Sequence, residues 1–310
     1  MLAGPRLGHA YPSCRALTAR PLWPGLLLAM LGAIGFSGKA IIVKLAYRHG
    51  VDAVTLLMWR MLLALPFFVV LAWWAGRGKR RLTARDWRDI AVLGFTGYYL
   101  ASFLDFAGLA YITASLERLI LYLNPTLVLL ISVVFFHHRI ERRQVLALAT
   151  SYAGVVAVFA HELHFEGAGT AIGAALVFGS AVSYAIYLAL SGRVVQRLGA
   201  LRLTGLASTV ACLLCLAQFA LLRPLDAALV PEPVMWLSLL NATACTVVPV
   251  LMLMLAIARI GAPLASQVGM VGPMSTLLIG VLILHEPMNA WIALGTLLVL
   301  GGVFLVGRKA

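Results

Sequence analysis

Long apolar runs, separated by short polar breaks, follow one another along almost the whole chain. A helix needs about 20 predominantly apolar residues to cross the hydrocarbon core of a bilayer, and roughly ten runs approach that length. They cover residues 24–46, 53–74, 88–108, 112–136, 143–160, 168–190, 203–222, 235–256, 259–284 and 289–307. The pattern predicts an all-α polytopic membrane protein with ten transmembrane helices, behind a cytoplasmic N-terminal arm over residues 1–23.

Composition narrows the class of protein further. The 310 residues are 62% hydrophobic and 11% charged, and the mean hydropathy is +0.98. Soluble domains are about 45–50% apolar and about 25% charged. These values exclude an ordinary soluble enzyme, a disordered chain and a fibrous repeat, and they make the lipid bilayer the expected surroundings of the protein.

The net charge of +13 reports membrane orientation rather than a nucleic-acid partner. Between the spans, eighteen lysines and arginines fall on one side of the predicted membrane, and two, Arg48 and Arg223, fall on the other. Basic loops stay in the cytoplasm, so both termini are predicted to be cytoplasmic in the cell inner membrane. No nucleic-acid partner is expected, because no aromatic and basic module accompanies the charge.

The sequence repeats itself at an offset of 148 residues. Pro125 then aligns with Pro273, Gly154 with Gly302, Phe36 with Tyr184 and His137 with His285. The offset divides the chain into two five-helix units, residues 24–160 and 168–307. Five is odd, so the second unit enters the membrane inverted relative to the first. Inverted repeats are typical of transporters, whose substrate site lies near the bilayer midplane where the repeats meet.

The end of each unit carries the motifs of a known family. In the second unit these are Gly272-Pro273, His285-Glu286-Pro287 and the glycines Gly295, Gly301 and Gly302. The chain resembles the drug/metabolite transporter superfamily in its ten-helix, EamA-type branch, and the Glu117-Arg118 pair resembles a subset of that family. The first unit departs from the pattern at His137-His138-Arg139. The resemblance implies an inner-membrane exporter of small metabolites, amino acids or drugs.

Five ionisable residues lie inside predicted spans, all in the outer half of the first unit: Lys39, Arg60, Asp105, Glu117 and Arg118. An unpaired charge near a helix centre costs at least about 2.5–3.5 kcal/mol, so these residues are candidates for a substrate cavity or gate. The alternatives are static ion pairs and snorkelling, which Arg60 could reach from near its helix end. We expect Asp105 to pair with Arg118, because the neighbouring Glu117 points about 100° away from Arg118 on the helix.

Further polar residues inside the predicted spans, together with these charges, would line a polar path through the membrane. On helical spacing, Tyr98, Ser102 and Asp105 share one face, and Glu117 shares another with Asn124. The second unit contributes further cavity candidates, namely Tyr184, Asn241 and Gln267. Pro125 and Pro273 interrupt equivalent helices and are candidate hinges, with a harmless kink as the alternative.

Two other motifs are interpreted as structural. Cys212 and Cys215 form a CxxC inside an apolar run, where packing is favoured over redox chemistry. Gly169 and Gly173 form a GxxxG that indicates close helix packing. His161-Glu162-Leu163-His164 lacks the spacing of a zinc motif and no phosphate-binding loop is present. We therefore predict no catalytic residue, no metal site and no cofactor.

The predicted function is a secondary transporter that exports a small-molecule substrate by alternating access. Proton coupling through a carboxylate and the oligomeric state are left open. One alternative is an intramembrane enzyme acting on lipid-linked substrates, which needs a catalytic polar cluster at interface depth that the sequence does not provide. The other is a membrane scaffold or receptor, against which the inverted repeat counts.

Overall fold

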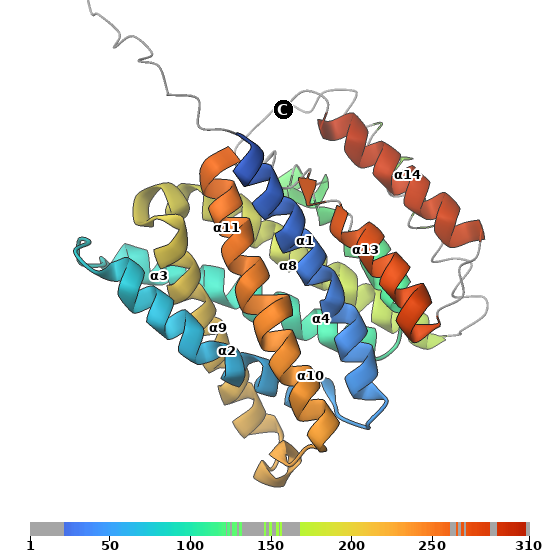
Figure 1. Ribbon diagram of the computed structural model, residues 1–310, viewed down its shortest axis with the longest axis horizontal. Coiled ribbons are helices and arrows are strands. Elements are labelled where there is room, and N and C mark those ends of the chain that lie inside the picture. The colour runs from blue at the N-terminus through green and yellow to red at the C-terminus, as the bar shows by residue number, and fades with distance from the viewer. Residues whose placement is uncertain are drawn as a thin grey trace, which may run out of the picture.

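The computed structural model is helical throughout the part of the chain that it describes (Figure 1). That part comprises residues 22–121, 123–124, 126–128, 130–131, 146, 149–150, 153–154, 156, 168–260, 265, 268–269, 271–285 and 290–307. Within these residues every regular element is an α-, π- or 3₁₀-helix. The predicted all-α fold class is therefore confirmed for the described residues.

The first half forms three complete hydrophobic helices and the start of a fourth. In chain order its elements are α1 (Leu22–Tyr47), α2 (Ala53–Gly76), α3 (Ala84–Leu93), the π-helix η1 (Gly94–Leu100), α4 (Ala101–Leu109) and α5 (Ala114–Leu121). Side-chain caps fix two of the starts. Asp52 accepts a hydrogen bond from the Val54 amide at 2.9 Å, and Thr83 and Asp86 form a capping box.

The second half repeats this order. Its elements are α8 (Ala168–Leu198), α9 (Ala200–Leu222), the 3₁₀-helix η2 (Leu225–Ala228), α10 (Glu232–Ala242), the π-helix η3 (Thr243–Val247), α11 (Val248–Ile260), α13 (Val271–Ile279), the π-helix η4 (Gly280–Leu284) and α14 (Ala290–Gly307). The predicted span over 259–284 starts too early, because Arg259 and Ile260 still belong to α11.

Six of the described helical stretches are long and apolar enough to cross a bilayer. They are Trp23–Tyr47, Ala53–Gly76, Ala84–Leu109, Gly169–Gly192, Ala200–Leu222 and Glu232–Ile260. Each coincides with one of the spans predicted from the apolar pattern. The total of ten spans stays a prediction, and the span expected at 143–160 lies largely outside the described residues.

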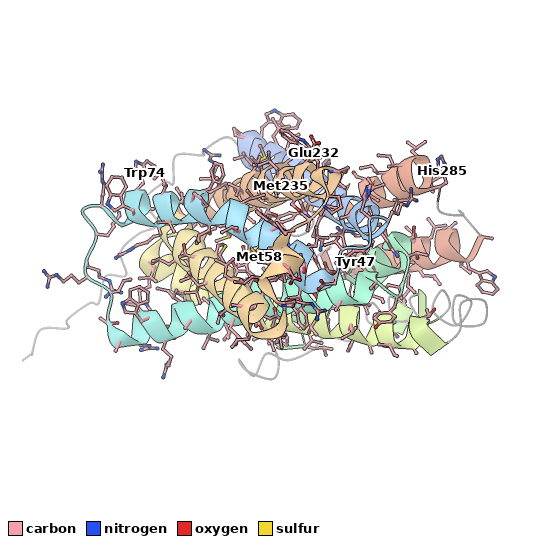
Figure 2. The ribbon with its side chains drawn as sticks, turned by 90° about the horizontal axis from the view of Figure 1, so that it is seen from below. Tyr47, Met58, Trp74, Glu232, Met235 and His285 are labelled. Carbon is pink, nitrogen blue, oxygen red and sulfur yellow. The ribbon has the colours of Figure 1, made fainter. Side chains whose placement is uncertain are left out.

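Helices of the two halves pack against each other rather than forming separate bundles. In Figure 1, α1 runs alongside α11 with α13 on its other side, while α2 and α9 lie together to the left of α11. The contact equivalent to α1–α11 at the repeat offset joins α8 of the second half to α4 of the first. Figure 2 shows α2 from Met58, in the middle of the molecule, to Trp74 at one end, with His285 at the opposite end.

Close contacts between the halves recur at the repeat offset. A Cβ added to Gly25 would lie 2.4 Å from Cγ2 of Ile260, and one added to Gly173 would lie 2.6 Å from Cγ2 of Ile112. Adding 148 to Gly25 gives Gly173, and subtracting 148 from Ile260 gives Ile112, so the two contacts are equivalent. The GxxxG glycine Gly173 therefore serves close packing, as its motif predicted.

Two further pairs of contacts are equivalent at the 148-residue offset, but a serine stands in one half where a glycine stands in the other. In the first pair, Ser180 donates to the Ala101 carbonyl at 2.7 Å, and the equivalent Gly32 would bring a Cβ within 3.2 Å of the Pro249 carbonyl. In the second pair, Ser183 donates to the Thr96 carbonyl at 2.7 Å. Its counterpart Gly35 approaches the Ala244 carbonyl, with an added Cβ 3.2 Å away. A serine hydroxyl in α8 thus takes the place of direct backbone contact in α1.

Two of the π-helical turns also lie at equivalent positions. The offset carries η1, Gly94–Leu100, onto residues 242–248, and η3 occupies Thr243–Val247 within that range. A π-helical turn adds one residue and changes the face that the following residues present. In both halves it lies where the long helix passes α1 or α8, so it sets which carbonyls meet the neighbouring helix.

Candidate functional site

Four charged side chains from three helices meet near one end of the bundle, and we call them the charge cluster: Lys39, Asp105, Glu117 and Arg118. The Lys39 ammonium, from α1, pairs with the Asp105 carboxylate of α4 and lies 3.5 Å from Oε1 of Glu117 in α5. Nε of Arg118 lies 3.0 Å from Oε2 of Glu117. The predicted gathering of these charges is therefore present in the structure.

The charge cluster is buried in protein. The side chains of Asp105 and Glu117 are 2% and 0% exposed, and that of Lys39 is 14% exposed. Ions leave water at a cost of several kcal/mol each, which mutual attraction offsets only when the ions are paired. The Glu117 carboxylate is contacted by Lys39 and Arg118 and lies beside the carboxylate of Asp105.

The pairing differs from the one expected from sequence. Asp105 was expected to meet Arg118, but its partner is Lys39, and Arg118 reaches back to its own neighbour Glu117. Adjacent Cβ atoms do diverge on a helix, but the long Glu and Arg side chains can bend toward each other. The guanidinium of Arg118 also donates to the Phe36 carbonyl at 3.2 Å, which ties α5 to α1.

Hydrogen bonds from α1 hold the cluster between the two halves. The Tyr47 hydroxyl donates to the Phe106 carbonyl at 2.6 Å, next to Asp105. On the opposite face of α1, Ser37 donates to the Gly272 carbonyl, and Thr276 donates to the Ser37 carbonyl at 3.3 Å. Helix α1 therefore contacts first-half charges on one side and the predicted Gly-Pro segment of the second half on the other.

Arg60 is fully within the protein and does not snorkel. Its side chain is 3% exposed, and its Nε donates to Oγ1 of Thr246 at 2.7 Å. The guanidinium carbon lies 5.2 Å from the ring centroid of Phe106, a cation–π distance. The sequence alternative of a snorkelling Arg60 is therefore wrong, because α2 places the side chain toward η3 and α4 rather than along its own axis.

Tyrosines form a second cluster where α8 meets η1. The hydroxyls of Tyr98 and Tyr187 lie 3.3 Å apart, and the Tyr184 and Tyr187 rings stack with centroids 5.6 Å apart. A Cβ on Gly97 would lie 2.4 Å from the Tyr187 ring, so only glycine leaves room for it. Tyr187 is not among the residues predicted from the sequence. Its signal was that the repeat offset makes it the counterpart of Lys39.

The remaining candidates are spread over several surroundings. Tyr98 contacts α8 whereas Asp105 contacts α1, so the predicted stripe with the half-buried Ser102 ends on two different helices. Oδ1 of Asn124 is buried without a hydrogen-bond partner among the described residues. Pro273 lies in the first turn of α13, where a missing N–H is tolerated.

Other sequence features are either packed or lie outside the described residues. Cys212 and Cys215 are buried and free, and Sγ of Cys212 is 3.8 Å from Sδ of Met61, which confirms their interpretation as packing residues. Outside the described residues lie Pro125, Gln267, the His137-His138-Arg139 turn and the His161–His164 motif.

Fold, hydropathy and buried charges together define a multi-pass helical membrane protein. The chain belongs to the EamA-like transporter family, whose model matches residues 23–160 and 171–308. The predicted membership of the drug/metabolite transporter superfamily is thereby confirmed. Membership of this family makes the protein a membrane transporter.

Relatives and a solved structure agree with this assignment. The uncharacterized transporter YcbK of Bacillus subtilis (strain 168) is 27% identical over 294 residues, which cover 91% of each chain. An uncharacterized transporter of Archaeoglobus fulgidus is 24% identical over 92% of this chain and 97% of its own. A crystal structure matches with a TM-score of 0.64 over 91% of this chain and 96% of that chain, and its 18% identity supports likeness of fold alone.

Proposed function

We propose that the protein is a secondary transporter that exports a small metabolite, amino acid or drug across the inner membrane by alternating access. The observation that carries this proposal is the buried charge cluster. Charged groups inside membrane spans are costly and typically mark a substrate or ion pathway. Here they come from α1, α4 and α5, so movement of any of these helices breaks or makes an ion pair.

The arrangement of the cluster suits an outer gate. Lys39 is the common partner of two carboxylates, and it sits on the helix that also contacts α13 of the second half. Displacement of α1 separates Lys39 from Asp105 and Glu117 and opens the path on that side. Uptake of a proton by one carboxylate would lower the cost of that separation, which gives proton coupling a chemical basis at this site.

Alternating access is supported by the equivalent contacts of the two halves. The contacts Gly25–Ile260 and Gly173–Ile112 relate residues 24–160 and 168–307 by one exchange, as a two-fold axis requires. We infer that the axis lies in the membrane plane, because each unit has five predicted spans. Rocking of one unit against the other would then expose the central path to each side in turn.

Comparison of metabolite release tests the transport function. Cells overexpressing the protein should release one or a few metabolites faster than deletion cells, and Asp105→Asn should abolish the increase. The exposed Asp226→Asn, on η2, is the matched control and should export normally. Equal release from overexpressing and deletion cells would contradict the proposal. Fusions at residue 310 should be active only with cytoplasmic reporters if both termini are cytoplasmic.

A further inference from the structure

The buried charges at the outer end of the first half do not balance. Three cations, Lys39, Arg60 and Arg118, face two carboxylates, Asp105 and Glu117. Both carboxylates are engaged by Lys39 and Arg118. Among the described residues no carboxylate lies within 4.0 Å of Arg60, so Arg60 forms no ion pair of its own and the five charges include one cation in excess. Protonation of a carboxylate would increase this excess.

The groups in direct contact with Arg60 are uncharged, and Asp105 acts on it electrostatically without forming an ion pair. Its Nε uses the Thr246 hydroxyl, and its face lies over the Phe106 ring. Its Nη1 is buried without a hydrogen-bond partner in the described part of the protein. A planar guanidinium presents a fork of donors that matches a carboxylate, and a hydroxyl with an aromatic ring satisfies only part of it. The side chain therefore keeps binding capacity for an anion.

A second unused polar group is joined to Arg60 through Thr246. The Thr246 hydroxyl, which accepts from Arg60, donates to the Asn241 carbonyl at 2.7 Å. The Asn241 side chain is 0% exposed, yet neither its Oδ1 nor its Nδ2 has a hydrogen-bond partner among the described residues. Buried amides of native proteins are normally satisfied, so an unpaired one indicates a missing partner.

The three residues come from both halves of the molecule. Arg60 lies on α2, whereas Asn241 lies in the last turn of α10 and Thr246 lies in the π-helix η3. The halves of an inverted-repeat transporter meet at the substrate site. Arg60 is also linked to the charge cluster, because the Phe106 ring beneath it follows Asp105 in α4.

We propose that Arg60, together with Thr246 and Asn241, binds the carboxylate of the transported substrate, which is a small organic monoanion. The guanidinium would receive the carboxylate oxygens, and the Asn241 amide would donate from the second half. With both carboxylates ionised, one bound negative charge brings the sum of the five buried charges to zero. This inference rests on the proposed transport function and adds the chemical class of the substrate.

The test uses the full chain in cells and sorts released metabolites by charge. Metabolites whose release rises with the wild-type protein should be monoanionic carboxylates. Their release should fall about tenfold or more with Arg60→Met, the scale of a lost charged hydrogen bond. Arg60→Lys should retain part of it. Arg223→Met, at an arginine whose side chain is 41% exposed, is the matched control and should release them at the wild-type rate.

Stability separates binding from a structural role. Arg60→Met removes a cation that has no carboxylate partner, so the purified variant should melt no lower than the wild type. A clearly lower melting temperature would make Arg60 a structural residue and overturn the inference. Neutral or cationic metabolites exported by the wild type would overturn it without any variant, as would full export of carboxylates by Arg60→Met. Absence of any exported metabolite would reject the transport function and this inference with it.

Discussion

Helices α1 and α8 occupy equivalent positions in the two halves but carry different chemistry. Lys39 of α1 pairs with Asp105 and Glu117, whereas its counterpart in α8, Tyr187, packs over Gly97 and against Tyr98. The backbone contacts around the two helices nevertheless correspond at the 148-residue offset. The duplicated framework therefore fixes how helices cross, and it leaves the side chains at the crossings free to differ.

The difference extends to every member of the charge cluster and to Arg60. Their counterparts at the repeat offset are Tyr187, Leu253, Ala265, Ser266 and Ser208. None of these five side chains is charged at neutral pH, so the buried charges are confined to one of the two equivalent regions. Under the proposed alternating access, ion pairing would close the path at one region and aromatic packing at the other.

Removing the common cation should have the largest effect. Lys39→Met leaves Asp105 without its counterion and Glu117 with only Arg118, and uncompensated buried charge costs about 3–5 kcal/mol. We expect a marked loss of thermal stability and no transport. Adding Asp105→Asn should recover most of the stability, because it removes the stranded charge. If Lys39→Met melted at the same temperature as the wild type, the charge cluster would have to be solvated by water. The equivalent Tyr187→Phe should lose far less.

Glycine substitutions test the shared framework. In Gly173→Ala the new methyl meets Tyr111 Cβ at 2.8 Å and the Gly108 carbonyl at 3.0 Å, neither of which moves easily. Overpacking of this kind costs about 1–3 kcal/mol. Gly25→Ala meets chiefly the Cγ2 methyl of Ile260 and should cost less. Gly192→Ala, on the same helix as Gly173 with nothing within 4 Å, is the control and should not lower the melting temperature. Equal melting temperatures of all three variants would contradict the close helix packing at Gly25 and Gly173.

The serine contacts of α8 should contribute less. Ser180→Gly and Ser183→Gly give α8 the residues that α1 has at equivalent positions, Gly32 and Gly35. Each change removes a hydroxyl that donates to a carbonyl beside η1, which is worth about 1 kcal/mol. The double variant should melt lower than the wild type but keep the fold. No change in melting would mean that the α1 type of direct backbone contact is equally good in α8.

The smallest effect is expected from the exposed ion pair that links the start of α2 to the end of α9. Oδ1 of Asp52 lies 3.2 Å from Nε of Arg223. Partial burial alone would raise the pKa of Asp52, but hydrogen bonds from Thr55 and Val54 and the charge of Arg223 together lower it. A lowered pKa in the folded state gives stability that is present above about pH 4 and lost as the pH falls through the folded pKa.

The variant Asp52→Asn keeps the helix cap and loses the charge. At pH 7 its free energy of unfolding should lie a few tenths of a kcal/mol below that of the wild type, as expected for such an exposed pair. Its melting temperature should be slightly lower for the same reason. The difference should close as the pH is lowered toward 3. A difference that persists at pH 3 would assign the effect to the cap rather than to the ion pair.

The hydropathy pattern and the rarity of charged residues in apolar helices allowed much of this structure to be predicted from the sequence. Apolar runs located the six long helices, because the bilayer imposes a length on each span. The rarity of charge in such helices singled out Lys39, Asp105, Glu117 and Arg118. The predicted spans put these four residues at a similar depth in the membrane, which indicated that they lie close together. The 148-residue repeat indicated two equivalent halves, and the structure contains equivalent contacts between helices of the two halves.

The pairings were not predictable, because they depend on helix rotation and on side-chain torsions that sequence spacing does not encode. Spacing favoured Asp105 with Arg118, and the structure pairs Asp105 with Lys39. The burial of Arg60 depends on how α2 faces η3 and α4. The π-helices escaped prediction because their composition, such as the segment Gly94–Leu100, differs little from that of an α-helix.

The paired π-helical turns bear on the origin of the molecule. Each is the trace of one extra residue in a helix, and the two lie 148 residues apart within matching segments. A single insertion in an ancestral chain of half the length, copied when its gene was duplicated, accounts for both. The charges, which only one copy carries, then diverged after the duplication, whereas the wide turn was kept in both copies. Deleting one residue from η1 would undo that insertion and rotate the two ends of its helix against each other by about 100°.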